Sequence, residues 1–92
     1  MIVRIAGEGQ YRLPDSDAGR LNELDNRAVA AVEDGDKIGF AELWGQMLAL
    51  VESDGQAIPD DELVGSDVIL PPRDVTFAEA AAEFSGDGLI PD

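Results

Sequence analysis

The 92-residue chain is 45% hydrophobic and has a formal net charge of −14, so it combines enough apolar side chains for one modest core with a strong acidic bias. It contains neither cysteine nor histidine, which excludes disulfide bonds, a cysteine nucleophile, a Ser-His-Asp triad and zinc sites built from those residues. Its six Lys and Arg residues form no cluster, which argues against direct binding to nucleic-acid phosphates or to an anionic membrane surface.

The charge is unevenly distributed along the chain. Residues 1–46 carry five basic and nine acidic side chains, whereas residues 47–92 carry eleven acidic side chains and a single basic one, Arg73. A basic protein partner would explain this bias. Solubility alone would also explain it, as would a cytoplasm of high salt in which counter-ions screen the repulsion.

The first residues predict a β-hairpin. Residues 1–6 (MIVRIA) and 10–13 (QYRL) are β-rich, and Gly7-Glu8-Gly9 between them suits a tight turn. Pro14 ends the second strand. Because one hairpin is not stable alone, we expect its apolar face to lie on helices.

A first helix is predicted after Pro14. Apolar residues recur at helical spacing from Leu21 to Val32, Asp15, Ser16 or Asp17 can cap the start, and Gly35 can end the helix. The polar residues within this stretch fall mostly on the opposite face; they are Glu23, Asp25, Asn26 and Arg27.

A second helix follows almost at once, capped by Asp36 and ending near residues 53–55. Its apolar face is wide and consists of Phe40, Leu43, Trp44, Met47, Leu48, Leu50 and Val51. Because the connection is so short, the two helices must be antiparallel. Gly39 and Gly45 are costly inside a helix, so they predict close approach of another helix. Trp44 is interpreted as a core residue or, if part of this face stays exposed, as a contact for a protein partner.

Residues 56–75 are predicted to be mostly connection. Pro59 with Asp60-Asp61-Glu62 is able to open a single helical turn, and residues 68–70 (VIL) form either a short strand or an extended segment on the core. Pro71-Pro72 then requires an extended backbone, and it cannot continue a strand into a sheet because proline has no backbone N–H to donate.

A short third helix is predicted near the end of the chain. Thr76 and Glu79 match a capping box, and Gly86 or Gly88 can end the helix. Its buried stripe is predicted to consist of Phe77, Ala80, Ala81 and Phe84. The fold class is therefore α+β: an N-terminal β-hairpin on an antiparallel helical hairpin, an extended Pro-Pro segment and a short third helix, in a single domain over residues 1–92.

No motif identifies chemistry. Asp15-Ser16-Asp17 resembles the start of a calcium loop, but Arg20 stands where that loop needs Gly and Asn26 where it needs an acid. Residues 60–62 are either a solvated acidic turn or a weak site for a divalent ion. We expect no enzyme and no cofactor. The N-terminus lacks the long apolar region of a signal peptide and no apolar run approaches the roughly 20 residues of a membrane span, so we expect a soluble, cytoplasmic protein.

Three stretches carry a resemblance to a known family. They are MIVRIAGEGQY at residues 1–11, LNELDNRAVAAVEDGD at 21–36 and LVGSDVILPPRDVTFAEAAAEFSGDGLIPD at 63–92. Over its whole length the chain resembles the PspA-associated protein family, PspAA, which comprises small acidic proteins tied to the phage-shock membrane-stress system. The second helix departs from the family pattern, because two glycines and Trp44 stand where a more regular amphipathic run is expected.

The resemblance implies a non-enzymatic adaptor or regulator of PspA, a coiled-coil protein that assembles on stressed inner membranes. Such a protein would reach the inner face of the membrane only through its partner. The candidate contact residues are Trp44, Pro71, Pro72, Arg73, Asp74, Leu89 and Ile90. In the alternative interpretation of this segment, Ile69, Leu70, Leu89 and Ile90 only seal the bottom of a small core. Two other functions stay open: a self-associating homodimer that buries the spare face of the second helix, and an acidic mimic of nucleic acid.

Overall fold

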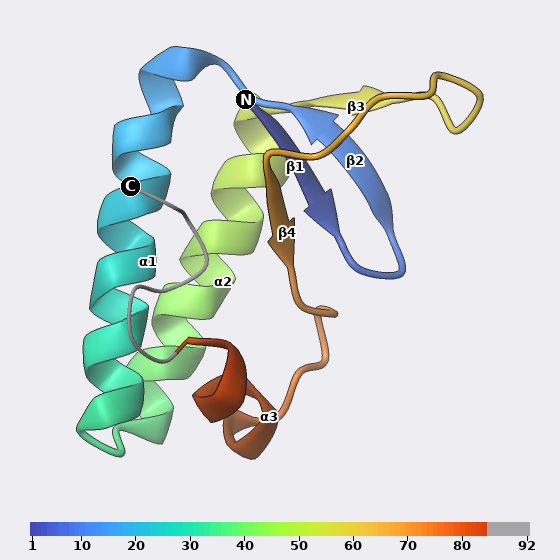
Figure 1. Ribbon diagram of the computed structural model, residues 1–92. Coiled ribbons are helices and arrows are strands. Elements are labelled where there is room, and N and C mark those ends of the chain that lie inside the picture. The colour runs from blue at the N-terminus through green and yellow to red at the C-terminus, as the bar shows by residue number, and fades with distance from the viewer. Residues whose placement is uncertain (85–92) are drawn as a thin grey trace.

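Residues 1–84, which the computed structural model describes, form a mixed sheet of four strands with helices packed on one of its faces (Figure 1). The elements in chain order are β1 (Ile2–Ile5), β2 (Gly9–Arg12), a 3-10 turn (Asp15–Asp17), α1 (Ala18–Glu33), α2 (Lys37–Asp54), β3 (Gln56–Ile58), β4 (Val68–Leu70) and α3 (Phe77–Glu83). The α+β class predicted from the sequence is confirmed.

The strand order in the sheet is β3-β2-β1-β4. The predicted hairpin is confirmed as the antiparallel pair of β1 and β2, and residues 68–70 form a true strand, parallel to β1, with Val3 opposite Val68 and Ile5 opposite Leu70. The prediction that residues 56–75 are mostly connection is wrong at its start, because β3 follows α2 directly and pairs antiparallel with β2. The helical turn predicted after Pro59 is a simple turn instead, closed by a 3.0 Å hydrogen bond from Glu62 N to Pro59 O.

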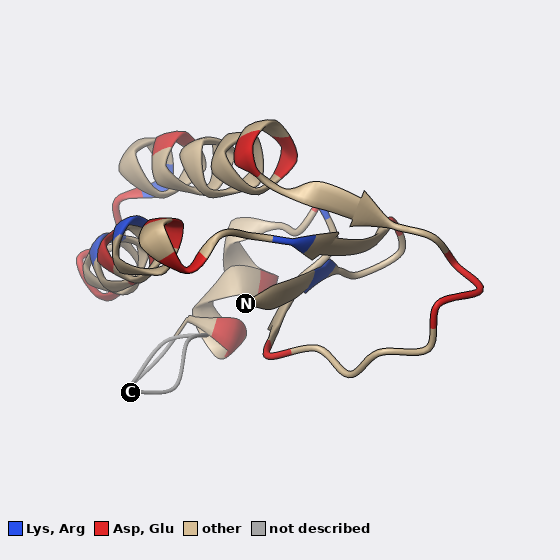
Figure 2. Ribbon diagram, turned by 90° about the horizontal axis from the view of Figure 1, so that it is seen from above, with Lys and Arg blue, Asp and Glu red and all other residues tan. Residues whose placement is uncertain are grey.

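The core lies between the helix-facing side of the sheet and the pair α1 and α2, and Figure 2 shows the helices and the β3–β4 connection on opposite sides of the sheet. Alternate strand residues supply the sheet side of this core, because successive side chains of a strand point to opposite faces. The fully buried sheet-side residues are Val3, Ile5, Leu13, Val68 and Leu70. The predicted packing of the hairpin on helices is therefore observed.

The helices α1 and α2 lie side by side and antiparallel, as predicted (Figure 1). Gly35 has a φ of 69°, a left-handed conformation that ends α1 at little steric cost, and the Asp36 carboxylate accepts a 2.9 Å hydrogen bond from Gly39 N. The predicted side-chain cap of α1 is wrong: Asp17 is the N-cap residue, but its side chain makes no capping hydrogen bond, and the 3-10 turn leads into the helix instead.

Asp25 is 0% exposed, although the polar pattern of α1 predicted it on the outer face. It lies one turn after Leu21 and one turn before Ala28, so helical geometry places it on the buried stripe. No buried side-chain nitrogen or oxygen within residues 1–84 lacks a hydrogen-bond partner, so Asp25 is accommodated rather than left unsatisfied.

Neither glycine of α2 marks a close helix approach, so that prediction is wrong. A Cβ atom at Gly45 would meet nothing within 4 Å, because this position is exposed. A Cβ atom at Gly39 would overlap the Asp36 carboxylate, so this glycine leaves room for the cap of its own helix.

The capping box of α3 is confirmed. Glu79 N donates to Thr76 Oγ1 at 3.1 Å and Thr76 N donates to Glu79 Oε1 at 3.1 Å. The hydrogen bond from the Thr76 backbone, and then one from its hydroxyl, hold the pKa of the Glu79 carboxyl below its ordinary value. Of the predicted stripe, Ala80 and Phe84 are fully buried, whereas Phe77 and Ala81 are only partly covered. The helix ends at Glu83, and Gly86 and Gly88 lie outside the described residues.

The contrast between the two glycines of α2 gives the first prediction. Gly45→Ala removes the entropic penalty of glycine at an open helical position and should raise the free energy of unfolding by about 0.5–1 kcal/mol. Gly39→Ala is the matched control and should bring no such gain, because the new methyl group displaces the Asp36 cap, a loss of about 1 kcal/mol. Urea unfolding followed by circular dichroism measures both, and an equal gain in the two variants would contradict the role assigned to Gly39.

Candidate functional site

The predicted contact residues that the structure describes lie together in space. Residues 71–75, here called the proline segment, run past α2, and Trp44 Nε1 donates a 3.2 Å hydrogen bond to the backbone oxygen of Arg73. Trp44 is only 6% exposed, so in this conformation it offers a partner little surface and instead holds the proline segment on the core. Leu89 and Ile90 lie outside the described residues.

An aromatic cluster surrounds Trp44. The Phe84 ring meets the Trp44 ring edge to face at a centroid distance of 5.8 Å and the Phe40 ring at 5.2 Å. Pro71 is also buried, whereas Pro72, Arg73 and Asp74 are exposed. The exposed part of the predicted contact site is therefore the short stretch 72–74, and its binding to a partner stays a prediction.

Arg73 is held in place by two glutamates from other parts of the chain. Its Nε donates to Glu8 Oε2 at 3.1 Å and its Nη2 to Glu8 Oε1 at 2.8 Å, and Nη2 also pairs with Glu52. Glu8 lies in the β1–β2 turn and Glu52 in α2, so one side chain joins the turn, the helix and the proline segment. The hydrogen bonds that the guanidinium donates to Glu8, and then to Glu52, raise its pKa.

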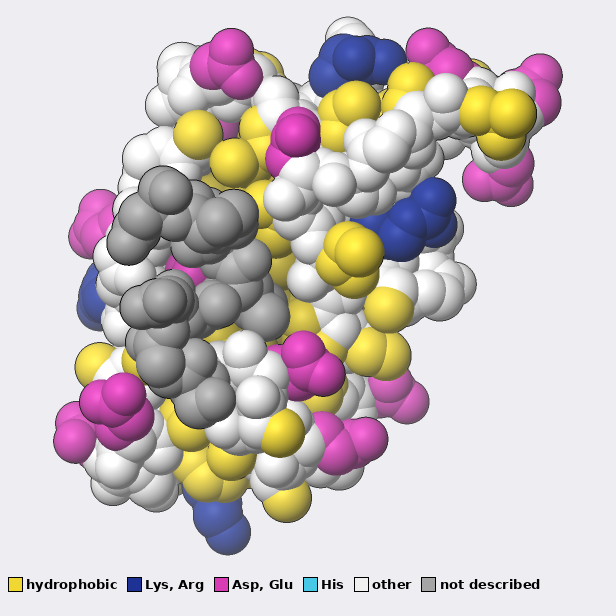
Figure 3. All heavy atoms as spheres, in the orientation of Figure 1, with side chains coloured by type: hydrophobic (Ala, Val, Ile, Leu, Met, Phe, Trp, Pro, Cys, Tyr) yellow, Lys and Arg dark blue, Asp and Glu magenta, His cyan; other side chains and the backbone are white. Residues whose placement is uncertain are grey.

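Within the described residues, the second half of the chain has no basic side chain outside this arrangement. Arg73 is the only basic residue of residues 47–92, and its charge is neutralised within the molecule. The exposed acids of residues 59–84 are Asp60, Asp61, Glu62, Asp67, Asp74, Glu79 and Glu83. Figure 3 shows acidic side chains spread over one face of the molecule, with smaller areas of Lys and Arg between them.

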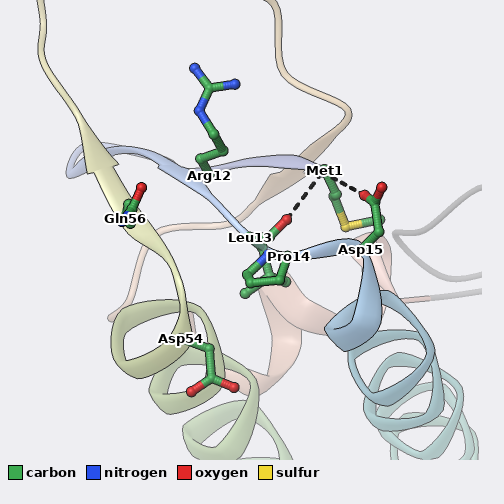
Figure 4. A pocket seen from close by; sticks show the side chains of 7 residues that line it. All are labelled: Met1, Arg12, Leu13, Pro14, Asp15, Asp54 and Gln56. Atoms are coloured by element: carbon green, nitrogen blue, oxygen red, sulfur yellow. Dashed lines mark hydrogen bonds and ion pairs between the residues drawn. The ribbon is translucent and has the colours of Figure 1, made fainter.

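A hollow of about 500 Å³ lies where the end of β2 meets the end of α2. Its lining consists of Met1, Arg12, Leu13, Pro14, Asp15, Asp54 and Gln56 (Figure 4). The Met1 amino group donates to Leu13 O and to Asp15 Oδ1, each at 3.1 Å, so the first residue is tied to one side of the hollow.

A pair of carboxyl groups lies beside this hollow. Partial burial raises the pKa of the Asp17 carboxyl, and the nearby charge of Asp54 and a hydrogen bond that the protonated Asp17 donates to that side chain raise it further. These two residues are 37 positions apart, so no local pattern predicts that they meet. A cation beside the pair would reduce the repulsion between the two carboxylates. Within residues 1–84, however, no three acidic side chains are grouped so as to hold a metal ion.

The fold and this surface define a small acidic α+β protein in which the pairing of Arg73 with Glu8 and Glu52, here called the arginine clamp, joins three segments of the chain. The family model described as PspA-Associated protein, PspAA, matches residues 1–92, and the chain belongs to this family. Comparison with curated proteins and with solved structures gave no match. Of the helices in residues 1–84, none combines the length and the apolar character needed to cross a membrane.

The clamp gives the second prediction. Arg73→Gln removes the ion pairs with Glu8 and Glu52 but keeps the backbone oxygen that Trp44 uses, so the variant should unfold at a lower temperature and exchange the amide protons of the proline segment faster. Because exposed ion pairs are screened by salt, the difference from the wild type should shrink between about 0.1 M and about 1 M NaCl.

Arg27→Gln, an exposed position on α1, is the control with the same change in charge. Thermal unfolding and amide hydrogen exchange measure both variants. Equal losses in the two variants at both salt concentrations would show that net charge, and not the clamp, causes the effect.

The carboxyl pair gives the third prediction. Because the folded-state pKa of Asp17 is raised, its contribution to stability is fully present below the ordinary pKa and is lost as the pH rises through the folded value. Asp54→Asn removes the repulsion and leaves an amide that can donate to Asp17. The variant should therefore be more stable than the wild type at about pH 7, and this gain should fade towards about pH 3.

Asp60→Asn removes one negative charge from an exposed loop and serves as the control for net charge. Melting temperatures across this pH range measure the effect. If Asp54→Asn gains no more than Asp60→Asn at neutral pH, the repulsion between Asp17 and Asp54 is not a significant cost to the fold.

Proposed function

We propose that this protein is a non-enzymatic adaptor or regulator that binds a PspA-type coiled-coil protein in a membrane-stress response. The observation that carries the proposal is the match of the whole chain to the family described as PspA-associated. The partner is inferred from that description, and the mode of action from the surface of this chain.

The charge distribution supports binding to a basic stretch of the partner. Among the described residues of the C-terminal half, Arg73 is the one basic side chain and is paired with Glu8 and Glu52, whereas the other exposed charged side chains are acidic. Complementary charges speed the encounter of two proteins and fix their register more than they raise affinity. On this proposal the protein is cytoplasmic and reaches the membrane through its partner.

The burial of α2 favours the adaptor over the homodimer. The homodimer requires a spare apolar face on this helix, but its large apolar residues lie mostly within the monomer core. Those buried are Phe40, Leu43, Trp44, Met47, Leu48 and Val51. Light scattering on the pure protein separates the two functions, since an adaptor of this kind stays monomeric without its partner.

The fourth prediction tests the adaptor directly. The protein should co-purify with the PspA-type protein of the same organism at about 0.05 M NaCl and should be released progressively as the salt concentration rises. An unrelated protein of similar net charge controls for non-specific retention. No complex at low salt would falsify the proposed function, whereas a complex that salt leaves unchanged would contradict the electrostatic mode of binding and favour an apolar contact.

A further inference from the structure

Leu63 is the most exposed large hydrophobic residue of the described chain, at 95%. It lies in residues 59–67, here called the crossing loop, which runs from β3 at one edge of the sheet to β4 at the other. Figure 2 shows this loop projecting on the side of the sheet away from α1 and α2. A leucine in this place contributes nothing to the core of its own chain.

The crossing loop is fixed to the sheet on both sides of Leu63. Before it, Glu62 pairs with Arg12 on β2 at 3.5 Å. After it, Gln10 Nε2 donates to Val64 O at 3.0 Å and to Ser66 Oγ at 2.8 Å. The loop is thus held by strand β2 immediately before and after this one outward-facing leucine.

The far end of the crossing loop is fixed to β1. Ile2 N donates to Asp67 Oδ2 at 2.7 Å, and Asp67 N donates to Ile2 O at 2.8 Å. Ile58, the last residue of β3 before the loop, is buried, and Val64 within the loop is half-buried. A loop that is already ordered loses less conformational entropy when it binds, so the contact of Leu63 with a partner would be favoured by pre-organisation.

The surroundings of Leu63 indicate the chemistry of the partner. Asp60 and Asp61 are exposed just before it, in the turn that the Glu62–Pro59 hydrogen bond closes. A single apolar side chain with acids on one side is complementary to a small apolar pocket rimmed by Lys or Arg. Ile38, 76% exposed at the start of α2, also follows exposed acids, Asp34 and Asp36, but it adjoins the exposed Lys37 and no loop fixed to the sheet presents it.

We propose that residues 60–64 are a docking loop in which Leu63 inserts into a small apolar pocket, rimmed by Lys or Arg, on the protein partner. The inference rests on the proposed function, because it assigns the contact made in that same complex. Arg12 and Gln10 act here as positioning residues, since they hold the loop and leave Leu63 outside.

The test is the affinity of the purified protein for the purified PspA-type protein of the same organism. Leu63→Ser should weaken binding by roughly tenfold or more, because the buried leucine supplies an apolar contact of that size. Leu63→Met should retain most of the affinity. Ile38→Ser, which removes another largely exposed apolar side chain elsewhere, should bind as the wild type does. Circular dichroism confirms that each variant is folded.

The acids are tested separately with Asp60→Asn combined with Asp61→Asn. This variant should associate more slowly at low salt and depend less on salt, with a smaller change in the dissociation rate. If the wild type binds and Leu63→Ser binds equally well, or if Ile38→Ser loses as much affinity, the docking loop is refuted and the adaptor function stands. If the wild type does not bind at all, the adaptor function is refuted and the docking loop with it.

Discussion

The parallel pairing of β1 with β4 is the contact on which the rest of the arrangement depends. Parallel neighbours cannot be joined by a tight turn, so the chain between them has to travel away from the sheet and return. The chain between β1 and β4 includes α1 and α2, which cover one face of the sheet. It ends in the crossing loop, which lies on the other side of the sheet. The same pairing brings the acidic last third of the chain beside its first residues.

The arginine clamp and the acidic surface are two results of one distribution of charge. Arg73 is the single basic residue of residues 47–92. Its side chain joins the β1–β2 turn, α2 and the proline segment. The contacts between these three segments gain an exposed ion pair with good bidentate geometry. Under the proposed function, this acidic surface is complementary in charge to a basic stretch of the partner.

Local signals in the sequence were sufficient for the hairpin, the two long helices and the capping box, because a turn glycine or a cap acts on neighbouring residues. The strand β3 was missed, since its three residues are too short for a periodic pattern and depend on pairing with β2. The sequence predicts that Gly39 and Gly45 mark close approach of another helix, and the structure contradicts this at both positions. The buried face of α1 is predicted by the sequence apart from Asp25. Local sequence patterns do not predict the contacts of the candidate site, because these contacts join residues far apart in the chain. They are the contacts of Arg73 with Glu8 and of Trp44 with the proline segment. Trp44 was recognised as a core candidate from its helical spacing alone.

Both outer strands of the sheet are only three residues long, and this brevity affects how the protein behaves at high concentration. An exposed strand edge is a template on which another chain can add, and exposed Ile69 on β4 would strengthen such an addition. Here β4 is followed at once by Pro71 and Pro72, which have no amide protons with which to continue a ladder. Together with the mutual repulsion of molecules of net charge −14, these short and proline-terminated edges oppose fibril-like assembly.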